Sequence, residues 1–167
     1  SPVDREFYVM QSEVYTAQPF GTTGNLTFDY QAMLDERPQY YTFNGASMAL
    51  TTDENALRAN VGETVRIFFG VGGPNKMSSF HVIGEMFDRV YDLGSLTTPP
   101  MTDVQTTIVP PGGATMVEFE VQVPGRYILV DHALSRLERG LAGYLYVDGA
   151  DQPDIFHGEG TADTSGH

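Results

Sequence analysis

PGRYILVDHALSRLERGLAGYLYV, residues 124–147, contains two alternating apolar segments separated by a charged insert. The segments GRYILV and YLYV have the two-residue period of β-strands. The insert SRLERG predicts a short helix or a loop. Asp131 and His132 directly follow the first strand, where an apolar side chain would be easier to bury. The position of this polar pair therefore requires an explanation.

The rest of the chain consists mainly of short strand-like segments that end at Gly or Pro. They recur at intervals near ten residues and include EFYVMQSEVY, YYTFNGA, TVRIFFG, FHVIG, MFDRVYDL, QTTIVPPGG and ATMVEFEVQV. This pattern predicts an all-β fold, an antiparallel β-sandwich or Greek-key barrel. One or two short helices are expected, and DYQAMLDERP, ended by Pro38, is the clearest candidate.

Residues 114–123 show the alternation well and predict one buried and one solvent-facing side. The core side would carry Val117, Phe119, Val121 and Val123, and the wet side Met116, Glu118, Glu120 and Gln122.

The length of 167 residues predicts one domain with a substantial core. We assign residues 1–150 to this domain and residues 151–167 to a polar tail, since that segment has little apolar content beyond Ile155 and Phe156. The chain begins close to a strand without a signal peptide, so we expect a mature or cut fragment with an upstream partner domain.

Composition excludes several classes of function. The chain has no cysteine, which rules out disulfides, thiolate zinc sites, cysteine nucleophiles and a blue copper centre. A net charge of -13, with Lys76 as the only lysine, argues against nucleic acid or anionic membrane as partners. No window approaches the roughly 20 apolar residues of a membrane span. Such acidity suits high salt, although an ordinary acidic surface is the alternative.

Four histidines are the main candidates for chemistry. His157 and His167 lie in the tail, where a solvated role is expected. His81 and His132 lie beside predicted core strands, where a hydrogen-bonded structural role competes with an imidazole metal site or an acid–base role. Two histidines are too few for a closed site, so a metal here would need ligands from another domain or subunit.

Other catalytic templates are missing. GVGGPN is rich in glycine but leads to another strand, so it lacks the helix N-terminus that would hold a phosphate. There is no G-x-S-x-G motif. Acidic pairs such as Asp53 and Glu54 give no specific support for a glycosidase.

Over residues 6–150 the chain resembles the second, C-terminal cupredoxin domain of copper-containing nitrite reductases. The segments that carry the resemblance are, in order, FNGA, VGETVRIFF, GGPN, SSFHVIGEMFDRV, QTTIVPPGGA, VPGRYILVDHAL and GLAGYLYV. The frame of a cupredoxin copper loop is matched by Gly125, Tyr127, Gly143, Leu145 and Val147. Asp131 stands at the thiolate position and Leu141 at that of the axial methionine, so the domain has lost its own mononuclear copper.

The resemblance implies a role for each site residue. His132 matches the third histidine ligand of a type 2 copper, supplied across a subunit interface. His81 matches a catalytic histidine that is not a ligand but donates a proton beside bound nitrite. Ile83 matches the aliphatic wall of the nitrite pocket. Thr107 matches a threonine that supports the catalytic histidine, whereas Thr106 replaces a glutamate found in some members.

The resemblance also implies the reaction and its partners. Nitrite would be reduced to nitric oxide in denitrification, with one electron and two protons. The type 1 copper and two type 2 ligands would lie in an absent first cupredoxin domain. Further expected partners are neighbouring subunits of a homotrimer and an electron donor such as a small cupredoxin or a cytochrome. The expected location is periplasmic or otherwise extracytoplasmic.

Two alternatives remain open. A multicopper oxidase fragment would be built from the same domains, although the usual H-x-H and H-C-H motifs are absent. A copper-free cupredoxin-like assembly module would carry no chemistry. If the nitrite reductase interpretation holds, the insert SRLERG is a candidate interface segment, with Arg136 and Arg139 expected to pair with carboxylates of a neighbour.

Overall fold

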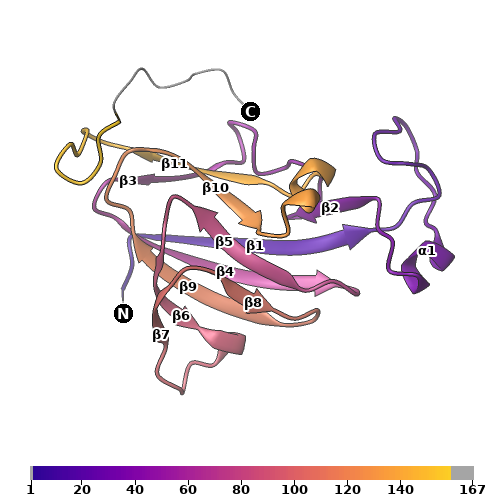
Figure 1. The fold of residues 1–167 in the computed structure, drawn as a ribbon, viewed down its shortest axis with the longest axis horizontal. Helices are drawn as coiled ribbons and strands as arrows, with labels where there is room; N and C mark the ends of the chain where they lie inside the picture. Colours follow the sequence, from indigo (N-terminus) through magenta and orange to yellow (C-terminus); the bar gives the residue numbers. More distant parts are fainter. Residues whose placement is uncertain (1, 159–167) are drawn as a thin grey trace.

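The computed structural model describes residues 2–158, which form two β-sheets packed face to face (Figure 1). The six-stranded sheet contains β2 (Tyr40–Phe43), β1 (Arg5–Val14), β4 (Thr64–Gly73), β9 (Ala114–Glu120), β6 (Phe87–Tyr91) and β7 (Met101–Val104), in this order. The five-stranded sheet contains β3 (Leu57–Asn60), β11 (Gly143–Asp148), β10 (Gly125–Asp131), β5 (Ser78–Ile83) and β8 (Thr107–Val109). The predicted all-β sandwich of cupredoxin type is confirmed.

Helices are short, as expected. The α-helix α1 (Tyr30–Leu34) lies within the predicted segment, and Asp29 caps it by accepting a hydrogen bond from the amide of Ala32. The 3₁₀ helices are η1 (Asp92–Gly94) and η2 (Leu134–Arg139), and η2 is the charged insert. None of the helices within residues 2–158 has the length and hydrophobicity to cross a membrane.

The strand pairing is mixed rather than purely antiparallel. β1 runs parallel to β4, and β3 runs parallel to β11, whereas the other pairs are antiparallel. Parallel neighbours require the chain to cross between sheets, because a tight hairpin joins only antiparallel strands. Within the five-stranded sheet, β5 and β10 are far apart in sequence but are direct antiparallel neighbours, and this pairing matters for function.

A row of phenylalanine rings fills the space between the sheets. Phe80 of the five-stranded sheet stacks on Phe69 with 3.9 Å between ring centroids, and lies 5.7 Å from Phe87. Phe87 in turn contacts Phe119 at 5.8 Å. All four are essentially fully buried, and aromatic side chains supply the largest apolar area per residue. The row therefore fixes β5 firmly against the opposite sheet.

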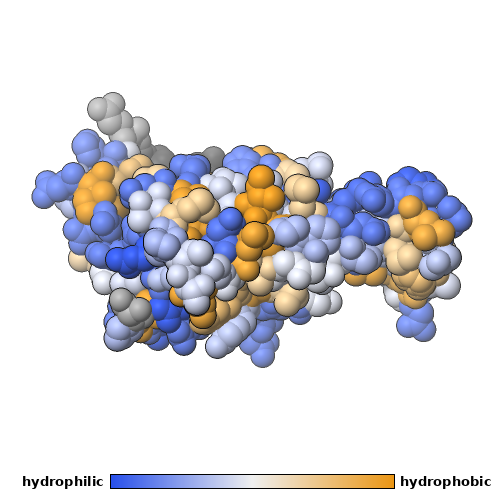
Figure 2. All heavy atoms as spheres, turned by 90° about the horizontal axis from the view of Figure 1, so that it is seen from below, coloured by the Kyte–Doolittle hydropathy of each residue, from blue (hydrophilic) through white to orange (hydrophobic). Residues whose placement is uncertain are grey.

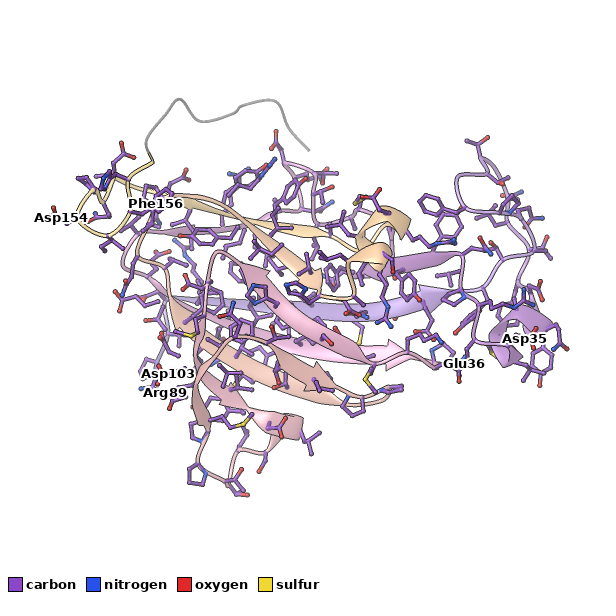
Figure 3. All side chains as sticks on the ribbon, viewed as in Figure 1. Asp35, Glu36, Arg89, Asp103, Asp154 and Phe156 are labelled. Atoms are coloured by element: carbon purple, nitrogen blue, oxygen red, sulfur yellow. The ribbon has the colours of Figure 1, made fainter. Side chains whose placement is uncertain are left out.

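Residues 16–39 form an arm that projects from one end of the sandwich and carries α1 (Figure 1). The space-filling view shows mixed apolar and polar surface on this arm (Figure 2). Asp35 and Glu36 lie at the arm, whereas Asp154 and Phe156 lie at the opposite end of the molecule (Figure 3). Phe156 is 66% exposed, and the assignment of residues 151–167 to a tail stays a prediction, with 159–167 and His167 outside the described residues.

The outer side of β9 differs from the prediction. Glu118 was expected on a wet face but is only 1% exposed. Arg66 covers it through a guanidinium–carboxylate ion pair, and Arg89 of the neighbouring strand approaches to 3.5 Å. Long arginine side chains bury their carbon chains on the sheet and shield the carboxylate. Alternation alone therefore gave the correct face but the wrong exposure.

We expect Glu118→Gln to lower the free energy of unfolding by about 3 kcal/mol, because it removes the buried carboxylate that pairs with Arg66 and Arg89, and Glu6, which also pairs with Arg66, is far more exposed. Denaturant unfolding measures this change. The control is Glu120→Gln on the same strand, whose side chain is exposed. An equal effect of both substitutions would contradict the importance of burial.

Candidate functional site

The two candidate histidines meet at one end of the five-stranded sheet. β5 and β10 pair with Val130 opposite His81 and Asp131 opposite Phe80, which brings His132 beside the start of β5. The amide of His132 donates to the carbonyl of Ser79 at 2.8 Å. The ring centroids of His81 and His132 are 5.4 Å apart. Their juxtaposition follows from the strand register and not from proximity in sequence.

His81 is held in one orientation. Its flanking residues Phe80 and Val82 point into the core, so alternation directs His81 to the other side of the sheet. Its Nδ1 lies 2.6 Å from the carbonyl oxygen of Gln105, and because a carbonyl only accepts, Nδ1 carries the proton. Burial lowers the pKa of His81, and nearby His132 lowers it further, although the Gln105 hydrogen bond opposes this. Nε2 is left for an external partner.

His132 has the opposite character. Its side chain is exposed, and its imidazole makes no hydrogen bond to any residue between 2 and 158. A histidine buried and hydrogen-bonded within its own domain could not act as a ligand for an external metal. The observed ring is therefore suited to coordination.

Ile83 shares the His81 side of the sheet. It lies two residues further along β5, opposite Ile128 of β10, and is 39% exposed. An exposed aliphatic side chain next to the two imidazoles is consistent with the predicted wall of a small pocket.

Thr107 lies on the other face. It pairs with Phe80 and is buried, and the described residues give its hydroxyl no hydrogen bond to His81. Its supporting role stays a prediction. The partner that the structure does provide, the Gln105 carbonyl, was missed because a backbone group leaves no residue-type signal in a sequence.

Asp131 is the most heavily hydrogen-bonded carboxylate near the site. It is 1% exposed and accepts from Gln11 Nε2 at 3.0 Å and from the amides of Ser79 and Ala133 at 3.2 and 3.1 Å. Arg136 completes the set through a short ion pair. Leu141, expected at the axial methionine position, is fully buried in the core.

Arg136 has a partner that the sequence did not predict. Its guanidinium pairs with Asp131 of its own chain, donates to the carbonyl of Met77 at 2.6 Å and lies 5.2 Å from the Tyr41 ring centroid. The structure thus gives Arg136 a carboxylate partner within its own chain, and its pairing with a neighbour stays a prediction. Arg139 donates to the side chain of Gln39 at 3.2 Å, and its pairing with a neighbour stays a prediction.

Across residues 2–158, no three His, Cys, Asp or Glu side chains form a group that could hold a metal ion. A family model described as "Multicopper oxidase" matches residues 20–151. The chain belongs to the multicopper oxidase family. The prediction of a cupredoxin-type domain thus agrees with both its fold and its sequence.

Individual relatives of this multicopper oxidase domain are nitrite reductases. The "Copper-containing nitrite reductase" of Neisseria meningitidis is 49% identical over 154 residues, covering 92% of this chain and 39% of the relative. A solved copper nitrite reductase from Nitrosomonas europaea has a TM-score of 0.77 and 27% identity, covering 92% of this chain and 52% of that chain. A Cu-containing nitrite reductase from Thermus scotoductus has a TM-score of 0.76 and 26% identity, covering 90% and 32%.

The predicted resemblance to copper-containing nitrite reductases is confirmed by these matches. The domain spans only about two fifths of the length of the Neisseria relative, where the match covers 39%.

Glu85 follows Ile83 at the rim of the site. With Gly84, Met86 and Gln105 it lines a shallow groove, so the same residue 105 contacts both the groove and His81. The pKa of Glu85 is raised from 4.5 to about 7, mainly by burial and to a smaller extent by Asp88, against the opposing hydrogen bond from the Met86 amide. The carboxyl is therefore partly protonated at neutral pH.

This raised pKa predicts a pH dependence of stability. A carboxyl with a higher pKa in the folded state stabilises the fold fully below pH 4.5, and the contribution disappears as the pH rises through about 7. Between pH 5 and pH 8 the unfolding free energy of the wild type should fall by about 1–2 kcal/mol more than that of Glu85→Gln. This figure is already reduced for the partial exposure of the side chain. Denaturant unfolding at both pH values measures it, and parallel curves for wild type and variant would contradict it.

Proposed function

We propose that this domain is one part of a copper-containing nitrite reductase and completes its active site. His132 would be a ligand of a type 2 copper shared between subunits, and His81 the proton-donating residue beside nitrite. The observation that carries the proposal is the pairing of an exposed, unbonded His132 imidazole with a buried, oriented His81 at a ring separation of 5.4 Å. The similarity to copper-containing nitrite reductases, 49% identity in the Neisseria meningitidis relative, favours nitrite reduction over other copper-dependent reactions.

The donor set fits copper. Imidazole nitrogen is a preferred ligand of copper, and the chain has no thiolate that would make a blue copper site. With His132 as one ligand, the remaining ligands come from the first cupredoxin domain of a neighbouring subunit, which also carries the type 1 copper. The type 2 copper supplies a cationic centre that binds nitrite and delivers the electron.

The residues of this chain would supply the protons for the reaction. Reduction of nitrite to nitric oxide and water consumes one electron and two protons. The Gln105 carbonyl keeps the proton of the neutral His81 ring on Nδ1, so Nε2 is the position that takes up and passes on a proton. Gln105 also fixes the plane of the ring, so proton transfer needs no reorientation of the imidazole.

Ile83 shapes the pocket on the nitrite side. Its exposed side chain and the facing Ile128 place apolar surface beside the imidazoles. Such surface would form one wall of the proposed nitrite pocket. Thr107 would support His81 indirectly, by holding β8 and the preceding Gln105 in place through its pairing with Phe80.

Association with further domains is supported by apolar surface on the six-stranded sheet. Tyr8 stacks on Phe68 at 4.9 Å and is 70% exposed, next to a groove also lined by Met10, Leu96 and Met116. Exposed apolar patches of this kind commonly mark interaction surfaces. We propose assembly with the first cupredoxin domain into a homotrimer, and reduction by a small cupredoxin or a cytochrome.

The setting of this enzyme follows from its reaction. Nitrite reduction to nitric oxide belongs to denitrification, and we place the enzyme in the periplasm or another extracytoplasmic compartment. The net charge of -13 fits a saline environment, where self-repulsion is screened. A copper-free assembly module and a multicopper oxidase fragment are the competing functions, and substitution of His132 separates the assembly module from the proposal.

The assembled His132→Ala enzyme should lose type 2 copper and nitrite reduction while keeping its type 1 copper, because one of the ligands is gone. Copper content per subunit and nitric oxide formation measure this. His157→Ala, an exposed histidine outside the site, is the matched control and should behave as wild type. Unchanged type 2 copper in His132→Ala would favour the assembly module.

His81→Asn should keep type 2 copper and lower kcat for nitrite roughly 100-fold, because a proton-transferring side chain typically contributes at least this factor. Steady-state kinetics of the copper-loaded enzyme measure it. Loss of the metal together with activity would instead make His81 a ligand.

A further inference from the structure

A buried ion pair lies directly behind His132. Asp131 faces the core with Phe80, whereas the next residue, His132, faces the side of the sheet that carries His81. Neither charge of the pair is free to move: the Asp131 carboxylate is 1% exposed, and the Arg136 side chain is 17% exposed. A charge pair this deep is costly to remove from water and is retained only when it is fully hydrogen-bonded.

The Asp131 carboxylate joins four separate parts of the chain. Gln11 donates to it from β1 in the opposite sheet, Ser79 from the start of β5, and Ala133 from the residue after His132. Arg136 donates from η2, five residues further along. The carboxylate therefore ties together both sheets and the loop that follows β10.

His132 is held on both sides by this arrangement. Its own amide donates to the Ser79 carbonyl at 2.8 Å, and the amide of Ala133 donates to Asp131 at 3.1 Å. Arg136 anchors the far end of the loop by its second donation, to the Met77 carbonyl at 2.6 Å. The backbone of His132 is thus fixed although its side chain is exposed.

We infer that Asp131 and Arg136 are positioning residues, which hold the exposed His132 imidazole in the orientation required of a metal ligand. The inference rests on the proposed role of His132. It goes beyond that role because it assigns a function to the buried ion pair. The ring of a ligand offered to another subunit cannot be oriented by contacts within its own domain, so the ligand is oriented through its backbone. Groups that support a ligand in this way typically change metal affinity 10- to 100-fold.

The test uses the assembled, copper-loaded enzyme with Asp131→Asn or Arg136→Gln. Each should weaken type 2 copper binding at least tenfold in competition with a chelator, and change the copper hyperfine splitting in the electron paramagnetic resonance spectrum. Type 1 copper signals should not change.

Glu118→Gln is the matched control, because it breaks the other buried carboxylate–arginine pair, with Arg66, on the opposite sheet. It should lower thermal stability by a similar amount, yet leave type 2 copper affinity within twofold of wild type. If Glu118→Gln weakens copper binding as much as Asp131→Asn does, the ion pair acts only through stability and the inference is overturned.

Two further outcomes keep the inference separate from the proposed function. Asp131→Asn with wild-type copper affinity and spectrum, while His132→Ala loses the metal, overturns the positioning role alone. His132→Ala that keeps type 2 copper overturns the proposed function itself. If Asp131→Asn yields no assembled enzyme, Asp131→Glu is measured instead: it keeps the charge, shifts the anchor by one methylene, and should still weaken copper binding.

Discussion

The antiparallel register between β5 and β10 is the constraint on which the site depends. It sets Val130 opposite His81, and so carries His132 to the end of the sheet beside His81. A shift by one residue would turn every side chain of β10 to the other face, placing Asp131 outside and Leu129 in solvent. The buried Leu129 and Phe80 resist such a shift, so the core determines the geometry of the site.

The two buried carboxylates, Asp131 in the five-stranded sheet and Glu118 in the six-stranded sheet, are shielded from water in different ways. In the five-stranded sheet Asp131 is covered by the chain that follows it, and its donors come from nearby loops and from Gln11 across the core. In the six-stranded sheet Glu118 is covered only by arginines lying on its surface. The first arrangement restrains a loop, whereas the second only shields a strand. Comparable ion pairs can therefore have different consequences for function.

The sequence predicted the architecture well, because strand alternation and Gly and Pro positions report directly on local structure. The segment around α1 and the two candidate histidines were found for the same reason: they depend on residue type and order. The Gln105 carbonyl, the burial of Glu118 and the internal pairing of Arg136 were not predictable in this way. Each depends on which distant segments the fold brings together, and a long arginine side chain can reach several partners.

The contrast between His81 and His132 matches the different demands of the roles proposed for them. A residue that transfers protons to a bound anion works best when its ring is fixed and its neutral form is favoured, as burial and the Gln105 carbonyl achieve for His81. A ligand for a metal shared between subunits has to remain accessible in the separate domain. Copper bound across such an interface stabilises the assembly as well as the site, since any ligand that binds only the associated state shifts the equilibrium toward it. In the proposed enzyme the exposed His132 would thus link metal binding to oligomer formation, and its fixed backbone would make that link specific.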